Sequence, residues 1–277
     1  MPKPLLCVTV TAPTMAELRR QRDEVVDADL IELRLDSVSD PDVAGALAGR
    51  RCPVIVTCRP EWEGGRFKGA EEDRRRLLAD AWALGAEYVD IESRARFDDL
   101  LAQSGGRRVV LSYHDFDAVP VDLAGLVQAM RSTGAEVVKV AVKTARLSDC
   151  VPLRDVGALA GRQAGLVVIA MGPFGLATRV LAGRFGSMWT YAGSDHEVGQ
   201  VSAASLLNEY RFRECRTFPA VLASDRKVLL HTRLATFGEH PSGLGKFTRS
   251  MFARDLRRTV TTDSEAQLWT HDLQISP

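Results

Sequence analysis

Short runs of β-branched and other apolar residues recur along most of the chain, and longer amphipathic stretches separate them. The apolar runs predict eight strands, at residues 5–10, 30–35, 53–58, 87–91, 108–112, 136–142, 166–170 and 188–192. The amphipathic stretches predict helices at residues 15–26, 71–84, 123–132 and 151–163, and another at 201–212 after the eighth strand. Strands that alternate with helices in this way predict parallel βαβ units.

Eight successive βα units favour a closed barrel over an open sheet. A (β/α)8 TIM barrel, a fold of the α/β class, typically needs about 250 residues, and the chain has 277. The alternative is a doubly wound sheet, but that fold normally has a glycine-rich turn after its first strand. The first turn here reads TAPTMAE, without glycine. We therefore predict a barrel catalytic domain over residues 1–215 and a short C-terminal extension over 216–277, where the alternation stops.

Composition and charge narrow the classes of function. Lysine plus arginine and aspartate plus glutamate each number 36, so the formal net charge is zero and nothing overall attracts nucleic acid or an anionic membrane. No stretch approaches the roughly 18 apolar residues of a membrane span, and the apolar run near the N-terminus is too short for a signal peptide. The five cysteines form no C-x-x-C pair and no zinc-binding spacing. We expect a cytoplasmic protein with reduced thiols, no membrane or nucleic-acid partner and no metal.

Barrel enzymes carry their working residues at the C-terminal ends of the strands and in the loops that follow. Taken singly, the polar residues found there have ordinary explanations: an ion pair on a strand, a packed histidine, a solvated arginine. Together they predict one site at the barrel mouth. The candidates are Glu32, Arg34, Arg59, Glu63, His114, Lys139, Arg179, His196 and Gln200, with Asp36, Asp90, Glu92 and Asp115 nearby.

Lys139 is the most informative of these residues. It interrupts an otherwise apolar strand, between Val138 and Val140. Lysine is almost never buried without a reason. Burial favours the neutral amine, and a neutral amine can attack a ketone. The sequence therefore indicates Lys139 as a nucleophile, with Lys143, near the strand's exit, as the second candidate.

Several motifs, taken together and in order, resemble those of type I 3-dehydroquinate dehydratase. The resemblance spans roughly residues 5–212, and the combination is far more specific than any single piece. The matching segments are IELRLD (31–36), TCRPEWEGGRFKG (57–69), YVDIE (88–92), LSYHDF (111–116), VVKVA (137–141), MGPFGLATRVLAGRFGSMWTYAG (171–193) and GQVS (199–202).

This resemblance implies a dehydration of 3-dehydroquinate to 3-dehydroshikimate, a step of the shikimate pathway, through a lysine Schiff base and without cofactor. Lys139 would form the Schiff base, His114 would act as general acid and base, and Glu63 would orient the histidine. Arg179 would hold the substrate carboxylate and Gln200 the substrate hydroxyls. Glu32, Arg34 and Arg59 would also bind substrate, while Asp36, Asp90 and Glu92 would hold the arginines and the lysine. Asp115 would have a separate, structural role, and the protein would be a homodimer.

Two features depart from the family pattern. The closing loop usually reads Ser-Ala-Pro-Gly-Gln, but here it is HEVGQ, so His196 stands where a serine normally binds substrate. LLNEYRFREC (206–215) resembles the junction in proteins fused to shikimate dehydrogenase, yet residues 216–277 are too few for that domain and contain no G-x-G-x-x-G. We predict no dehydrogenase activity and no nicotinamide cofactor.

Two other functions stay open at this point. The lysine alone would also suit another Schiff-base barrel enzyme, such as a class I aldolase, although the EGG loop, the HDF motif and the setting of Arg179 disfavour it. The altered closing loop would also suit a non-catalytic relative that serves as a binding or regulatory protein. Against this stands the presence of the complete lysine, histidine and glutamate set.

Overall fold

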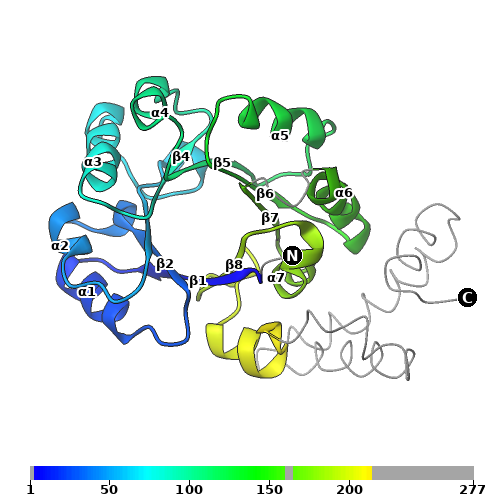
Figure 1. Ribbon diagram of the computed structural model, residues 1–277. Helices are drawn as coiled ribbons and strands as arrows, with labels where there is room; N and C mark the ends of the chain where they lie inside the picture. Colours follow the sequence, from blue (N-terminus) through cyan, green and yellow to red (C-terminus); the bar gives the residue numbers. More distant parts are fainter. Residues whose placement is uncertain (1–2, 160–164, 214–277) are drawn as a thin grey trace, which may run out of the picture.

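The computed structural model describes residues 3–159 and 165–213, which form an eight-stranded parallel barrel inside a ring of helices (Figure 1). The predicted barrel is thus confirmed. All eight predicted strands are present, with ends shifted by at most three residues. They are β1 (Leu5–Thr11), β2 (Leu30–Arg34), β3 (Val54–Thr57), β4 (Tyr88–Glu92), β5 (Val109–Asp115), β6 (Val137–Lys143), β7 (Gly165–Met171) and β8 (Trp189–Ala192).

The hydrogen-bonded order of the strands is β7-β6-β5-β4-β3-β2-β1-β8, so consecutive strands are neighbours and β8 returns to β1. β7 and β8 stand at the two ends of this order. The backbone N–H of Met188, just before β8, bridges them by donating to Leu166 O on β7 at 2.8 Å. We call this junction the seam of the barrel.

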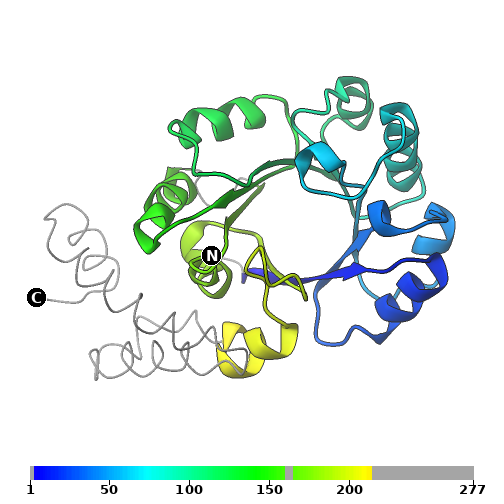
Figure 2. The same ribbon diagram turned by 180° about the vertical axis from the view of Figure 1, so that it is seen from behind.

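Helices cover the outside of the strands, as the view from behind also shows (Figure 2). Two of the helices described below begin at a capping side chain: Thr14 accepts a hydrogen bond from Glu17 N, and Asp122 accepts one from Gly125 N. The helix predicted over residues 201–212 is shorter than expected, with a π-helical turn at Ser205–Glu209. The main helices are α1 (Met15–Glu24), α2 (Val43–Leu47), α3 (Glu71–Ala83), α4 (Asp98–Ser104), α5 (Leu123–Arg131), α6 (Val151–Leu159) and α7 (Leu176–Val180).

Side chains alternate along each strand between the barrel interior and the helix layer. On β6, Val138, Val140 and Val142 pack outward against the helices, whereas Val137 belongs to an apolar cluster inside the barrel. That inner cluster also holds Cys7, Leu30, Ile55, Val110, Val167 and Trp189, and it fills the barrel floor. Polar groups on the inner face are therefore confined to the layers above this floor.

The fold leaves some expectations open. The proposed extension, 216–277, lies outside the described residues, so the domain boundary at 215 stays a prediction. Cys7, Cys52, Cys58 and Cys150 carry free thiols. Within residues 3–159 and 165–213, none of the helices has the length and apolar character that crossing a bilayer would require.

Candidate active site

A pocket of about 140 Å³ opens at the C-terminal ends of the strands, where the sequence placed the site. Its lining includes eight of the nine candidate residues: Glu32, Arg34, Arg59, Glu63, His114, Lys139, Arg179 and Gln200. The ninth, His196, is exposed, and its Nδ1 lies 3.2 Å from the backbone oxygen of Gln200. The structure therefore gathers the predicted set at one mouth and leaves the ring of His196 at the surface.

The register of the strands places Lys139 and His114 in successive layers of the barrel. Lys139 on β6 pairs with Ser112 on β5, and His114 comes two residues later on the same face of β5. Because residues two apart on a strand share a face, His114 lies one layer nearer the mouth than Lys139. A substrate entering from the mouth reaches the imidazole and the amine from the same side.

Lys139 is only 4% exposed, and acidic groups surround its amine. Its Nζ donates to Asp90 Oδ2 at 2.6 Å and lies 3.7 Å from Glu32 Oε1. The face of the Tyr191 ring is also close, with its centroid 5.0 Å from Nζ. Thr9 and Thr57 hydroxyls each donate to Glu32 at 3.0 Å and so fix that carboxylate. The amine thus has a defined position in the pocket wall.

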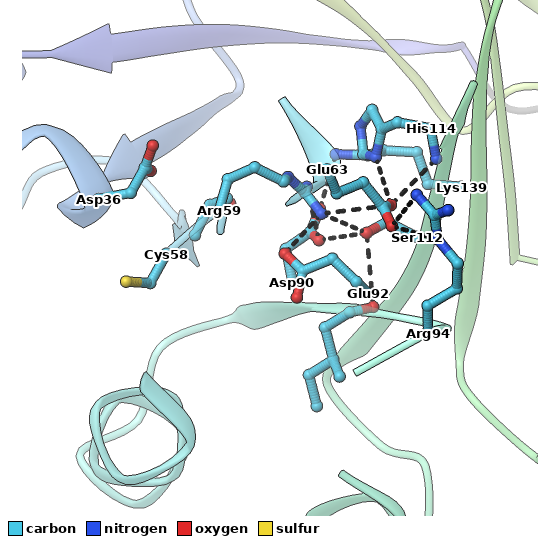
Figure 3. Close-up of polar contacts among 12 residues, drawn as sticks. Asp36, Cys58, Arg59, Glu63, Asp90, Glu92, Arg94, Ser112, His114 and Lys139 are labelled. Atoms are coloured by element: carbon cyan, nitrogen blue, oxygen red, sulfur yellow. Dashed lines mark hydrogen bonds and ion pairs between the residues drawn. The ribbon is translucent and has the colours of Figure 1, made fainter. Parts of the chain in front are cut away.

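Arg59 lies beside this lysine and is held by buried carboxylates (Figure 3). Its guanidinium donates to Asp90 at 2.8 Å, to Glu92 at 2.6 Å and to Ser112 Oγ at 2.8 Å. Burial alone would raise the pKa of Asp90, but Arg59 and Lys139 hold it well below its usual range. Glu92, which also receives a hydrogen bond from Arg74, has a raised pKa because burial outweighs these arginines. The roles expected for Asp90 and Glu92, in holding an arginine and the lysine, match these contacts.

Glu63 and His114 form a carboxylate–imidazole pair. Oε1 of Glu63 lies 3.0 Å from Nδ1 of His114 and accepts the His114 backbone N–H at the same distance. The short 3-10 helix Glu61–Glu63 ends at Gly64, with φ +76°, where a Cβ would come within 2.3 Å of the Phe116 ring. The glycine of the EGG motif therefore permits the turn that brings Glu63 to the histidine.

The protonation state of His114, paired with Glu63, is suitable for a general base. Burial, together with the nearby cations Arg59 and Lys139, lowers the pKa of His114 well below the usual value for histidine. The imidazole is then neutral at neutral pH. Since Glu63 accepts at Nδ1, the proton resides there and the lone pair of Nε2 stays available. Asp115 plays a separate part, because its carboxylate accepts the backbone N–H groups of Asp117 and Ala118 and shapes the next turn.

Arg179 and the closing loop, residues 194–200, form the opposite wall. Arg179 is 1% exposed, and burial lowers its pKa to about 10. Its Nη1 donates to Ala170 O and Gly175 O, and its Nη2 donates to Val198 O in the closing loop at 2.8 Å. Gln200 Oε1 is 3.3 Å from Asp195 N. Arg179 therefore connects the loop to the strand ends near the seam.

Sequence reasoning missed several residues of this site. Thr9 and Tyr191 line the pocket from β1 and β8, and strand alternation alone could have placed Thr9 above Cys7 on the inner face. Arg94 donates to Glu63 at 3.0 Å, but nothing in the Ser-Arg-Ala-Arg run distinguishes it from a solvated arginine. In the part of the chain that the structure describes, no three His, Cys, Asp or Glu side chains are grouped so as to hold a metal ion.

Fold and site together define the class of the chain, a (β/α)8-barrel enzyme with a buried lysine and a carboxylate-oriented histidine at its mouth. More specifically, the chain belongs to the type I 3-dehydroquinase family, whose model matches residues 6–216. It is 34% identical over 200 residues to a 3-dehydroquinate dehydratase of Desulfotalea psychrophila, covering 69% of this chain and 88% of that one.

Two other relatives bear on the fold and on the extension. The crystal structure of 3-dehydroquinate dehydratase from Geobacillus kaustophilus superposes with a TM-score of 0.68 at 26% identity, covering 82% of this chain and 93% of that one. A chloroplastic bifunctional 3-dehydroquinate dehydratase/shikimate dehydrogenase of Arabidopsis thaliana is 31% identical over 245 residues, or 83% of this chain. The match covers only 40% of that longer protein.

Proposed function

We propose that the protein is a 3-dehydroquinate dehydratase that forms 3-dehydroshikimate and water through a Schiff base on Lys139. The observation that carries the proposal is the buried amine of Lys139, held by Asp90 in the pocket that the His114–Glu63 pair also lines. Family membership supports the substrate. The other Schiff-base chemistry that the lysine alone would allow, such as an aldol cleavage, has no comparable support.

The first step joins lysine and substrate. Lys139 gives up a proton, and its free amine adds to the ketone carbon. The resulting carbinolamine takes up a proton and loses its oxygen as water to give an iminium ion. The positive nitrogen withdraws electrons from the adjacent carbon and makes its hydrogen acidic. No cofactor is needed for this, because the protein supplies the electron sink.

Elimination follows in two proton transfers. Nε2 of His114 takes the proton from the carbon adjacent to the iminium, and the electron pair moves to the nitrogen as an enamine. The enamine then expels the hydroxyl one carbon further on, which leaves as water with the proton returned by His114. Hydrolysis of the conjugated iminium releases the product and restores the amine. The water consumed here balances the water released in the first step, so one water is lost overall.

The remaining candidates bind and orient the substrate. Arg179, which lines the pocket, would hold the carboxylate, a task that suits the planar fork of guanidinium better than an ammonium. Glu32, Arg34, Arg59 and Gln200 line the pocket and offer partners for the hydroxyls and the ketone. His196 contributes only if the closing loop moves over the substrate, so its role stays a prediction. We further expect a homodimer in the cytoplasm, with the dimer testable by sedimentation equilibrium.

Incubation of the purified protein with 3-dehydroquinate, followed by the ultraviolet absorbance of the conjugated product, tests the proposal. The same mixture is reduced with borohydride and digested for peptide mass spectrometry. Product together with an adduct on Lys139 supports both the reaction and the nucleophile. An adduct without product indicates that the chemistry stops after imine formation, at His114 or the closing loop. Neither product nor adduct from a folded protein overturns the proposal and favours the non-catalytic relative.

A further inference from the structure

The two oxygens of Glu63 have different partners. Oε1 serves His114, through Nδ1 and the backbone N–H. Oε2 is held from the opposite side by Arg94, whose Nε and Nη2 both lie 3.0 Å away. The Glu63 side chain is 0% exposed, so water has no access to replace either partner. The orientation of the carboxylate thus depends on both contacts.

Arg94 is itself held in place. It follows the end of β4, and its guanidinium carbon lies 5.5 Å from the Trp62 ring centroid and 5.6 Å from that of Tyr113. Trp62 is fixed in turn by its indole N–H, which donates to Glu71. These aromatic contacts favour a single position of the guanidinium. With 51% of its side chain exposed, Arg94 reaches Glu63 from the rim and lies outside the set of residues that line the pocket.

Among residues 3–159 and 165–213, no other arginine or lysine touches Glu63 so closely. Arg59 Nη1 comes within 4.0 Å of Oε1, but it is hydrogen-bonded to Glu92 and Ser112. Burial raises the pKa of Glu63, and Arg59 and Arg94 oppose that rise. Loss of Arg94 therefore both frees Oε2 and favours the protonated form of Glu63. A protonated or rotated Glu63 no longer fixes the tautomer of His114.

We propose that Arg94 is a positioning residue for the dehydration, which holds Glu63, and through it the imidazole of His114, in the orientation that proton transfer requires. This inference rests on the proposed function. It assigns Arg94 to the elimination and not to imine formation, since the guanidinium contacts Glu63, the partner of His114, whereas the amine of Lys139 is held by Asp90.

The test compares Arg94→Gln, Arg94→Lys and the matched control Arg96→Gln. Arg96 lies on the same loop, is 81% exposed and pairs only loosely with Asp98, at 3.7 Å. For Arg94→Gln we expect kcat to fall between about 10-fold and 100-fold, as expected of a catalytic group displaced by roughly 1 Å, with KM little changed. The acid limb of the kcat profile moves upward by about one pH unit. Arg94→Lys keeps the charge and recovers part of the rate, and Arg96→Gln behaves as wild type.

A second measurement tests the contact between Arg94 and Glu63 in the absence of substrate. In the wild type, the Cε1 proton of His114, identified by its loss in His114→Asn, reports the titration of Glu63 by NMR. In Arg94→Gln this acid step moves to higher pH. An unmoved step, or a wild-type kcat with an unmoved acid limb, overturns the inference.

Borohydride trapping separates this inference from the proposed function. Arg94→Gln retains the adduct on Lys139 although its kcat is reduced. Loss of the adduct in this variant places Arg94 in imine formation and overturns its assignment to the elimination. Failure of the proposed function has a different signature, because the wild type itself then gives neither product nor adduct.

Discussion

Replacement of Arg59 by methionine removes the cation at the centre of the buried polar layer. Arg59 is 3% exposed and bridges Asp90 and Glu92, both 0% exposed. At an effective dielectric constant of about 20, each of these contacts contributes about 6 kcal/mol of attraction. Most of this is offset by the desolvation of the guanidinium. The carboxylates, however, stay buried in the variant, with Lys139 and Arg74 as their remaining partners.

We therefore expect Arg59→Met to lower the free energy of unfolding by about 3–5 kcal/mol near pH 8, the usual result of removing one partner of a buried ion pair. The loss depends on pH. Burial raises the pKa values of Glu63 and Glu92, and Arg59 opposes that rise in both. Without Arg59 their folded-state pKa values rise further above the unfolded value of about 4.3. A raised carboxyl pKa means that the folded state binds more protons, so the stability of the variant falls as pH increases.

Urea unfolding followed by circular dichroism, at about pH 5 and about pH 8, measures both effects. The difference between wild type and variant should be smaller at the lower pH, where the glutamates are partly protonated. Arg76→Met is the control, because Arg76 is 63% exposed and pairs with Asp73 at the surface. It should change the stability by less than about 0.5 kcal/mol. A loss below about 1 kcal/mol for Arg59→Met, or an equal loss at both pH values, would refute the reasoning.

Four further predictions concern the chemistry. Lys139→Ala should abolish turnover and borohydride trapping with an unchanged circular dichroism spectrum, and an adduct that persists would move the nucleophile to Lys143. His114→Asn should lower kcat by about 10²–10⁴-fold. In the wild type, because the pKa of His114 is lowered, kcat should stay flat from pH 8 down to about 6.5. His196→Ser should lower KM if the loop closes over the substrate. An unchanged KM would indicate that the His196 ring stays at the surface and does not contact the substrate.

The barrel could be predicted from the sequence because its strands and helices have different hydrophobic patterns. The strands, buried on both faces, are short continuous apolar runs, whereas the helices are longer and amphipathic. The ends were harder to place. β5 continues to Asp115 because Tyr113, His114 and Asp115 keep their register with β6, although their polar character resembles a loop. The helix after β8 was overestimated, since an apolar pattern does not reveal a π-helical turn.

For the candidate site, too, some features could be predicted from the sequence and others could not. Lys139 stood out because its neighbours on the strand are apolar, and the predicted pocket members follow from their position at strand ends. The strand pattern alone could not predict their pairing, because the stagger of strands around the barrel decides that Lys139 meets Asp90; only the family resemblance implied that Asp36, Asp90 and Glu92 would hold the lysine and the arginines. Arg94 was missed because its function depends on a contact across two loops. His196 was expected at the substrate from its place in a motif, but the backbone of the loop decides where its ring points.

The seam between β7 and β8 is the point at which the strand ladder of the barrel is interrupted, since these two strands stand at the ends of the hydrogen-bonded order. His114 and Lys139 lie on β5 and β6, within the continuous ladder, and Glu63 follows β3, whereas Arg179 and Gln200 flank the junction that the Met188 N–H bridges. Local opening begins where backbone pairing is weakest. Amide hydrogen exchange should therefore be fastest beside Arg179 and Gln200 and slowest in the strands on either side of Lys139. An opening of this kind would loosen one side of the pocket and leave the geometry of His114 and Lys139 unchanged.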